Sequence, residues 1–494
     1  MAVAVVQSRM MAAVGGLITI LGLYVLVAYL SPGYDDEFYN IGLVEYAPSV
    51  GALLDAVRRV DIHPPGQYLA NLVLFRVFGD WSVVRAFNAA LAALSIWGLW
   101  LMVQRQASWR VSAFAYFAIC LNPASLLWAS GLRWYAYFLP LINLAAILLI
   151  ANPRAPLRFW GAFFLLAAAL FFFGYAALLL VPPAFLVALY QRRSQLRDEA
   201  LIILVSGSLT LLLCAPQLFV LLTEQLPRGG AQIAGWSGAT QGLGLYLMSN
   251  QGALPVAFFG IMLILCNGLL LGHAALNWRR LRGGAVTSLF VLGSLALYAA
   301  RLTGKGRNLV TLASLQGVFQ VELFRLVKHR VLVVILFITL AIGNLGGVAN
   351  VINHHDTVKG SWNTPYAQVL AAIAQFAAEQ ACPTLQVMTH DPVFDYYLRR
   401  QGYAVFIISA GRRTIDPGVT YGCRVALLTF RGGLPPALNQ RYLEVIARLP
   451  YACGFKQFGF DRFAPFKRRF DPEVPDYYVG VAYFCQPPRA GPGA

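Results

Sequence analysis

The stretch FWGAFFLLAAALFFFGYAALLLVPPAFLVALY, residues 159–190, contains 32 consecutive residues without a charge. As one helix it would be about 48 Å long, whereas the hydrocarbon core of a bilayer is about 30 Å thick. Basic residues flank it on both sides: Arg154, Arg158, Arg192, Arg193 and Arg197. Because short loops rich in Lys and Arg face the cytoplasm, both flanks are expected inside. The stretch therefore predicts two membrane spans, with a turn near Phe173 and Gly174.

The composition of the whole chain supports this interpretation. Of its 494 residues, 59% are hydrophobic and only 12% are charged, whereas a soluble globular domain has roughly 25% charged residues. This excludes a soluble enzyme. The net charge of +17 comes largely from short loops between apolar runs, so it indicates topology and no nucleic-acid partner. The sequence predicts a polytopic α-helical membrane protein in contact with membrane lipids.

Nine other runs with few or no charges predict further spans, at 10–30, 83–104, 111–130, 134–151, 200–223, 254–276, 285–300, 308–324 and 331–350. The first is too long for the apolar part of a signal peptide and has no cleavage site after it, so we expect an uncleaved helix. Together with the two spans of 159–190 this gives about eleven. An N-terminus in the cytoplasm then places the tail outside. The weakest span is 308–324, which contains polar residues, and without it the tail would change sides.

Two regions outside the predicted spans have structure of their own. The first outer loop, 31–82, is expected to contain interfacial helices at about 36–47, 50–60 and 64–79. The tail alternates between strand and helix patterns, which predicts a small α/β domain. Its expected strands are 385–390, 403–409 and 424–429, and its expected helices are 365–380, 391–401 and 436–448. The predicted domains are therefore a transmembrane domain at 1–351 and a tail domain at 352–494.

The seven cysteines divide between the two predicted domains. Three lie in spans and four in the tail: Cys120, Cys214 and Cys266, then Cys382, Cys423, Cys453 and Cys485. Four cysteines in an oxidising compartment are compatible with two disulfides, for which three pairings exist. The pair Cys382–Cys423 is favoured because these cysteines flank the first three predicted strands. No Cys/His spacing predicts a zinc site, and we expect no metal and no cofactor.

Four motifs fall on the outer side in this topology. They are SPGYDDEFYN at 31–40, DIHPPGQY at 61–68, SGLRWYAY at 130–137 and RLTGKGRNLV at 301–310. Taken singly, each has an ordinary explanation, because acidic residues often begin a helix and basic residues often anchor a span at the membrane interface. Their convergence on one side, from four separate parts of the chain, favours a functional site.

These motifs resemble those of the GT-C membrane glycosyltransferases, in particular the bacterial branch related to protein O-mannosyltransferases and lipid A aminoarabinose transferases. The resemblance is strongest over residues 12–150. It implies that Asp36 is the catalytic carboxylate, with Asp35 as the rival and Glu37 beside them. It also implies a donor site that is made by His63, Tyr68, Arg133, Tyr135, Lys305 and Arg307. Relatives often have an acidic residue near the Arg-x-Tyr element, and its absence from 130–137 argues against a two-carboxylate or metal-bridged mechanism.

The resemblance also implies an activity, the transfer of a sugar from a polyprenyl-phosphate donor to an acceptor at the outer face of the bacterial inner membrane. The acceptor would be an envelope glycan such as lipopolysaccharide, a lipid or a protein hydroxyl, and the tail would be periplasmic. A single displacement with inversion is the simplest mechanism. The alternatives are a lipid or glycolipid transporter or flippase, and a non-catalytic scaffold. A transporter is disfavoured because the chain shows no internal repeat and no matching pair of broken helices.

Overall fold

The computed structural model describes residues 2–30, 35–61, 63–105, 107–225, 235–249, 258–277, 284–304, 306–352, 366–380, 382, 385–389, 391–407, 423–430, 452–460 and 477–484. The chain divides into two units, of which the first comprises residues 1–31 and 43–353 and the second comprises 32–42 and 354–494. The second unit therefore includes Asp35, Asp36 and Glu37, which the sequence places in the predicted transmembrane domain.

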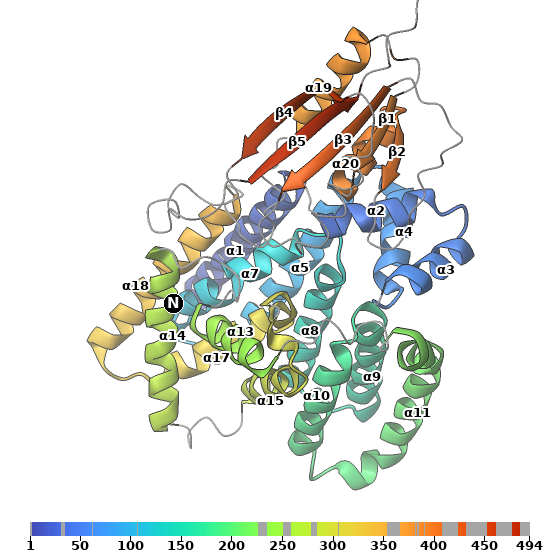
Figure 1. The fold of residues 1–494 in the computed structure, drawn as a ribbon. Helices are drawn as coiled ribbons and strands as arrows, with labels where there is room; N and C mark the ends of the chain where they lie inside the picture. Colours follow the sequence, from blue (N-terminus) through green and yellow to red (C-terminus); the bar gives the residue numbers. More distant parts are fainter. Residues whose placement is uncertain are drawn as a thin grey trace, which may run out of the picture. The chain divides into compact units, whose positions relative to one another are not determined.

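The first unit is helical (Figure 1). Its α-helices are α1 (Ala2–Leu30), the C-terminal part of α2 (Asp35–Tyr46), α3 (Val50–Val60), α4 (Gly66–Phe78), α5 (Trp81–Gln104), α6 (Trp109–Ala115), α7 (Pro123–Ala129), α8 (Trp134–Ala151), α9 (Pro156–Phe173), α10 (Ala177–Gln191), α11 (Leu196–Val220), α13 (Trp236–Ser249), α14 (Phe258–Asn277), α15 (Ala285–Ala299), α16 (Gly306–Leu309), α17 (Ala313–Leu326) and α18 (Arg330–Ile352). Shorter π- and 3₁₀-helical turns join some of them, namely η1 (Tyr116–Cys120), η2 (Leu221–Gln225), η5 (Leu302–Gly304) and η6 (Val310–Leu312).

Membrane crossing is supported by the length and hydropathy of these helices. Within the described ranges, eight helical segments are long and apolar enough to span a bilayer, and α10 and α15 are apolar but shorter. The polytopic fold is therefore confirmed, whereas the count of eleven stays a prediction. The predicted span 308–324 is interrupted, because a 3₁₀ turn separates α16 from α17.

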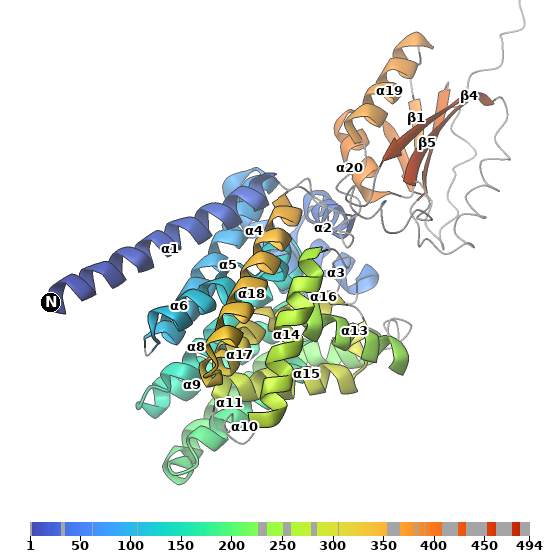
Figure 2. The same cartoon turned by 90° about the vertical axis from the view of Figure 1, so that its left-hand side faces the viewer.

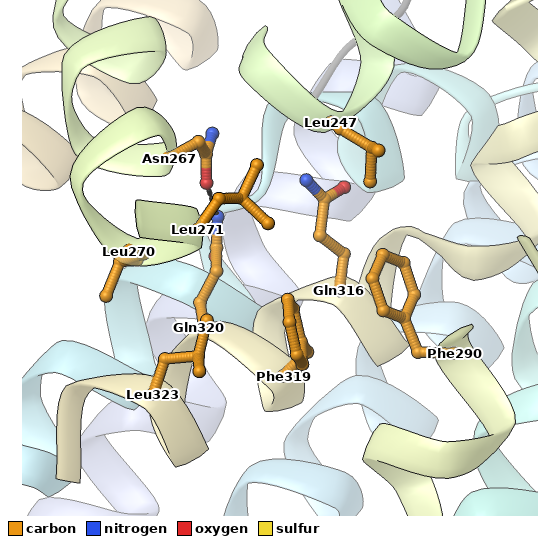
Figure 3. A pocket seen from close by; sticks show the side chains of 9 residues that line it. All are labelled: Leu247, Asn267, Leu270, Leu271, Phe290, Gln316, Phe319, Gln320 and Leu323. Atoms are coloured by element: carbon orange, nitrogen blue, oxygen red, sulfur yellow. Dashed lines mark hydrogen bonds between the residues drawn. The ribbon is translucent and has the colours of Figure 1, made fainter. Parts of the chain in front are cut away.

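The polar residues of that weakest span are accommodated inside the bundle (Figure 3). Gln320 of α17 donates to the side-chain oxygen of Asn267 on α14, and Asn267 donates to the carbonyl of Met248 at 3.2 Å. Gln316 lines the same small cavity, which has room for about one water molecule. The contact with Asn267 helps to explain why Gln320 can be buried in a mostly apolar bundle, since its amide nitrogen finds a partner on a neighbouring helix.

The long uncharged run 159–190 is broken as predicted. Helix α9 ends at Phe173, and Gly174 has extended backbone angles before α10 begins at Ala177. A side chain at Gly174 would place its Cβ 2.7 Å from the indole of Trp134, so the turn packs closely on α8. Two separate helices, and a turn at the predicted glycine, are therefore confirmed.

The buried side chain of Arg192 connects the two basic loops that flank this hairpin. Arg192 donates from Nε to Glu199 Oε2 at 2.8 Å, and both side chains are 2% exposed. The same guanidinium donates to Asn152 Oδ1 at 2.9 Å and to the carbonyl of Pro153 at 3.0 Å. The loop before α9 and the loop after α10 therefore lie together. This is the arrangement expected when two spans separate loops on one side of a membrane.

The second unit contains a five-stranded mixed sheet. Its elements are the N-terminal part of α2, α19 (Tyr366–Glu379), β1 (Leu385–Thr389), α20 (Pro392–Arg400), β2 (Ala404–Ile407), β3 (Cys423–Phe430), β4 (Ala452–Phe460) and β5 (Tyr477–Phe484). The strand order is β2-β1-β3-β5-β4; β1 is parallel to β2 and β3, and β5 is antiparallel to β3 and β4. Figure 2 shows α19 and α20 on the same face of this sheet.

The apolar core of the second unit lies between these helices and the sheet. Ile373 of α19 and Phe394 of α20 pack with Val387, Val425 and Val481 from the three central strands. The three predicted strands and two of the predicted helices are confirmed, and the third predicted helix, 436–448, lies outside the described residues. The sequence analysis missed β4 and β5. The part of β4 from 458 to 460 belongs to an aromatic stretch whose composition does not distinguish a strand from a surface loop.

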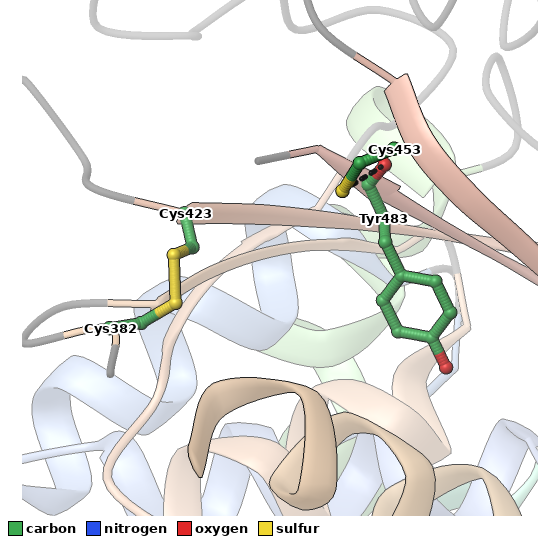
Figure 4. Close-up of a disulfide and its surroundings, with 4 residues drawn as sticks. All are labelled: Cys382, Cys423, Cys453 and Tyr483. Atoms are coloured by element: carbon green, nitrogen blue, oxygen red, sulfur yellow. Dashed lines mark hydrogen bonds between the residues drawn. A yellow bond between two sulfur atoms is a disulfide. The ribbon is translucent and has the colours of Figure 1, made fainter. Parts of the chain in front are cut away.

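The predicted disulfide between Cys382 and Cys423 is present (Figure 4). It joins Cys382, three residues before the start of β1, to the first residue of β3, and the start of β1 and the start of β3 are neighbours because the two strands pair in parallel. Cys453 is also disulfide-bonded, and Cys485 lies outside the described residues. The three cysteines of the spans are buried free thiols, as expected for small apolar side chains.

Candidate functional site

The loop between α3 and α4 is folded around one carboxylate. Asp61 follows the last residue of α3, and its backbone N–H donates to the carbonyl of Val57 at 2.9 Å. The side chain accepts a hydrogen bond from the hydroxyl of Tyr68 and another, at 3.2 Å, from the backbone N–H of His63. Pro65 then precedes α4, where a proline loses no helical hydrogen bond. The predicted donor residues His63 and Tyr68 are therefore held by the same acidic residue.

An arginine from a distant part of the chain pairs with this carboxylate. Arg133 immediately precedes α8, and its Nη1 lies 3.6 Å from Asp61 Oδ2. The Arg133 side chain is 7% exposed and that of Asp61 is 8% exposed. Removing two such charges from water is unfavourable unless they are well paired, so the position of each depends on the other. Arg133 thus joins His63 and Tyr68 in one cluster, as the motifs predict.

Buried amides hold α4, α5 and α8 together beside this cluster. Asn71 of α4 donates to the carbonyl of Leu132 at 2.9 Å and accepts from the hydroxyl of Tyr137. Asn88 of α5 donates to the same hydroxyl at 3.0 Å. Because Leu132 immediately precedes Arg133 in the chain, this network fixes the backbone that carries the arginine.

Aromatic rings connect the cluster to Tyr135, another predicted donor residue. The centre of the Trp134 ring lies 6.2 Å from that of His63 and 5.4 Å from that of Tyr135. Tyr135 also packs edge to face against Trp128 at 4.5 Å and is 1% exposed. Four of the six predicted donor residues are therefore close together in the first unit.

The end of α11 and the following turn contribute polar groups that the motifs did not indicate. Gln225 of η2 donates to the backbone carbonyls of Asp61 and His63, each at 3.5 Å. Its own side-chain oxygen accepts from the hydroxyl of Tyr175, to which Gln217 of α11 donates. These contacts join the turn between α9 and α10 to the Asp61 loop.

Glu224, the residue before Gln225, forms an ion pair that strengthens this connection. Arg58 of α3 donates through Nε to Glu224 Oε2 at 2.6 Å, and its Nη2 bonds the other carboxylate oxygen. This contact with Glu224 raises the pKa of the Arg58 guanidinium, which therefore stays charged. Arg58 is about half exposed, so the pair contributes mainly to orientation.

The predicted catalytic carboxylates lie at the start of α2. Asp35 and Asp36 are its first two residues, and their side chains lie outside the described part of the structure, whereas Glu37 is fully buried. This end of α2 belongs to the second unit, where Phe38 packs against Tyr396 with ring centres 5.3 Å apart. The role of Asp36 remains a prediction.

The basic loop of the fourth motif is only partly described. Lys305 lies outside the described residues; Arg307 is in the short helix α16, and its side chain is not described. Arg301 has a left-handed backbone, with φ of 57°, and its guanidinium lies 5.7 Å from the ring centre of Trp236. The contribution of Lys305 and Arg307 to the donor site therefore stays a prediction.

Sequence reasoning missed Asp61, although it begins the quoted DIHPPGQY motif. The segment 130–137 contains no acidic residue, and the structure supplies one from the α3–α4 loop instead. Two hydrogen bonds to its oxygens and the ion pair with Arg133 make Asp61 suited to positioning these groups. Among the described residues, no group of three His, Cys, Asp or Glu side chains is arranged to hold a metal ion.

The fold is similar to two crystal structures of ArnT from Cupriavidus metallidurans. The apo structure is 15% identical, with a TM-score of 0.54, and the match covers 95% of this chain and 98% of that one. The structure bound to undecaprenyl phosphate is 13% identical, also with a TM-score of 0.54, and the match covers 95% and 97%. No protein-family model and no curated protein matches the chain. The GT-C fold that the motifs predicted is confirmed, and at this identity the likeness concerns the fold.

Proposed function

We propose that this protein is a glycosyltransferase that takes its sugar from a polyprenyl-phosphate donor. The observation that carries the proposal is the buried pair of Asp61 and Arg133, with His63 and Tyr68 on the same carboxylate, at the predicted donor motif. The ArnT fold supports it, because one of the two similar structures was crystallised with undecaprenyl phosphate. A fixed arginine beside a histidine and a tyrosine is suited to a phosphate that carries a sugar.

The donor side of the reaction requires fixed positive charge. When the anomeric C–O bond breaks, its electron pair stays on the phosphate oxygen, and preorganised cations stabilise the negative charge that develops there. Arg133 is proposed for this role because Asp61 and the backbone at Leu132 hold it in place. Lys305 and Arg307 are proposed to add further positive charge near the donor phosphate.

The acceptor side requires a base. As the acceptor oxygen bonds to the anomeric carbon, its proton must pass to a nearby group, and Asp36 is proposed as that group, with Asp35 as the rival. This is a single displacement with inversion. Glu37 is fully buried and lies about 100° further around the helix, so it is a poor second nucleophile for a retaining mechanism.

The proposed location of the reaction is the outer face of the bacterial inner membrane, with a periplasmic tail. The disulfide between Cys382 and Cys423 supports a tail in an oxidising compartment. A periplasmic reporter fused after Ala494 should then be active, and activity of a cytoplasm-only reporter would contradict this topology. The proposed acceptor is lipopolysaccharide or another envelope glycan, with lipids and protein hydroxyls as further candidates.

The activity can be tested with membranes that contain the protein and a radiolabelled polyprenyl-phosphate sugar. Label should move from the lipid fraction to an acceptor only when the intact protein is present, and the Arg133→Met variant should serve as the inactive control. Mass spectrometry of envelope glycans from a deletion strain should then show which acceptor loses a sugar. Movement of unreacted donor across the membrane, with no transfer of label, would favour a flippase instead.

A further inference from the structure

Gln67, in the first turn of α4, is a buried amide that no motif assigns to the site. Its side chain is fully buried, and neither Oε1 nor Nε2 has a hydrogen-bond partner among the described residues. Buried polar side chains in native proteins are normally hydrogen-bonded, so an amide with both ends unpaired calls for an explanation.

The position of Gln67 connects it to the donor cluster. It immediately precedes Tyr68, whose hydroxyl bonds Asp61, and it lies four residues before Asn71. Residues four apart share one face of a helix, and Asn71 uses that face to bond the carbonyl of Leu132, next to Arg133. The side chain of Gln67 therefore belongs to the face of α4 that contacts the segment carrying Arg133.

The backbone around Gln67 has little freedom to relieve the unpaired amide. A Cβ built on Gly66 would lie 2.3 Å from the backbone carbonyl oxygen of Phe172, so the first turn of α4 is in direct contact with the end of α9. On the other side, Tyr68 is fully buried and bonded to Asp61. The backbone that carries Gln67 is therefore held on both sides.

The chemistry of a carboxamide indicates which ligand group would satisfy it. Nε2 can only donate and Oε1 can only accept, so one partner that satisfies both must itself accept and donate. An ionised phosphate only accepts, whereas a sugar hydroxyl, or a pair of neighbouring hydroxyl and amino groups, does both.

We propose that Gln67 is a specificity-determining residue that hydrogen-bonds the sugar of the donor rather than its phosphate. The inference rests on the proposed function. A site with a buried hydrogen-bond donor and a buried hydrogen-bond acceptor discriminates strongly against a ligand that lacks the matching group, because the amide is then left without a hydrogen bond. Gln67 thus sets which sugar is accepted, whereas Arg133 holds the phosphate that all donors share.

The test compares the Gln67→Met variant with the wild type, because Met has a similar size and no polar amide. Binding of purified full-length protein is measured for bare undecaprenyl phosphate and for a panel of undecaprenyl-phosphate-linked pentose, hexose and aminosugar. The comparison uses the panel member that the wild type binds most tightly. The variant should bind this ligand about tenfold more weakly than the wild type does, whereas both proteins should bind bare undecaprenyl phosphate equally well. Gln67→Leu should behave like Gln67→Met.

A stability measurement separates this role from a structural one. If the amide serves a ligand, Gln67→Met removes two unpaired groups and the ligand-free protein should melt at the same or a higher temperature. Gln386→Met is the matched control, because Gln386 is a buried glutamine of β1 whose Oε1 also has no partner within the described ranges. That variant should leave the binding of both kinds of ligand unchanged.

Other outcomes would overturn the inference. Equal binding of every panel member to wild type and variant, or an equal loss for the bare and the sugar-linked carrier, would show that Gln67 does not recognise the sugar. A lower melting temperature of the ligand-free Met and Leu variants would show a structural role instead. If the wild type binds neither bare nor sugar-linked undecaprenyl phosphate, the proposed function itself fails.

Discussion

Asp61 and Arg133 come from distant parts of the chain, and their charged groups lie 3.6 Å apart with both side chains less than a tenth exposed. The carboxylate also holds Tyr68 and the backbone of His63. One acidic residue therefore organises three of the residues that the sequence motifs assign to the donor site.

Loss of either charge from this pair should destabilise the protein and weaken donor binding. Asp61→Asn leaves a buried guanidinium without its counter-charge, and a broken buried pair typically lowers stability by about 3–5 kcal/mol. The double variant Asp61→Asn/Arg133→Met should lose less stability than the sum of the two single variants, as measured by thermal unfolding in detergent. Strictly additive losses would show that the two groups are not coupled.

The acidic residues at the start of α2 should differ in their effects. Asp36→Asn removes the proposed base but keeps its shape, so turnover should fall by roughly 10²–10⁴ with little change in donor affinity. Asp35→Asn should retain most of the activity, and Glu37→Gln should act mainly on stability because Glu37 is buried. If Asp35→Asn abolishes turnover and Asp36→Asn does not, the roles are exchanged. If neither change affects turnover, the proposed base is wrong.

The ion pair of Arg192 and Glu199 should be structural and not catalytic. Its guanidinium bonds the loop before α9 as well as Glu199, so Arg192→Met should release both loops and lower the melting temperature markedly. Turnover per folded molecule should stay close to that of the wild type. Arg193→Met is the matched control, because Arg193 donates only to the carbonyl of Tyr190 near the end of α10 among the hydrogen bonds of the described residues. A large loss of turnover without a loss of stability would contradict this assignment.

The tail should lose stability as the pH rises, because of Asp391. Burial raises the pKa of this carboxyl from 3.8 to about 7. Between about pH 4 and pH 7 the folded tail keeps a proton that the unfolded tail releases, so stability falls over that range and stays lower above it.

Asp391→Asn should remove this pH dependence, because Asn keeps an acceptor for the N–H of Val393 and carries no charge. Hydrogen exchange of the segment 385–400 in the full-length protein measures the effect. At pH 8 the variant should exchange more slowly than the wild type, and near pH 4 the two should be alike. A variant that is less protected at pH 8 would show that the ionised carboxylate is stabilising.

The disulfide between Cys382 and Cys423 should stabilise the tail. It closes a loop with a sequence separation of 41, and such a crosslink typically contributes about 2–4 kcal/mol. Mass spectrometry of protein digested without reduction should find the two cysteines in one linked pair of peptides. The double variant Cys382→Ser/Cys423→Ser should increase hydrogen exchange in β1 and β3, and free alkylation of both thiols in the unreduced wild type would contradict the pair.

The sequence by itself determined the class of the protein and most of its elements. An uncharged run too long for one span had to break, and Gly174 with basic residues on both flanks indicated where, because hydropathy and loop charge act locally along the chain. The helices α2, α3 and α4 and the first three tail strands followed from local patterns in the same way. The motifs also brought His63, Tyr68 and Arg133 into one expected site.

Only the tertiary structure decided which side chains meet. Nothing in the local pattern shows that Asp61 faces Arg133, or that Gln225 reaches the same loop from the end of α11. Gln67 looks ordinary in the sequence, and only its burial without a partner among the described residues makes it a candidate ligand-binding group. The reason is physical: hydropathy is a property of a segment, whereas a buried charge or amide depends on the atoms that helix packing brings within hydrogen-bond distance.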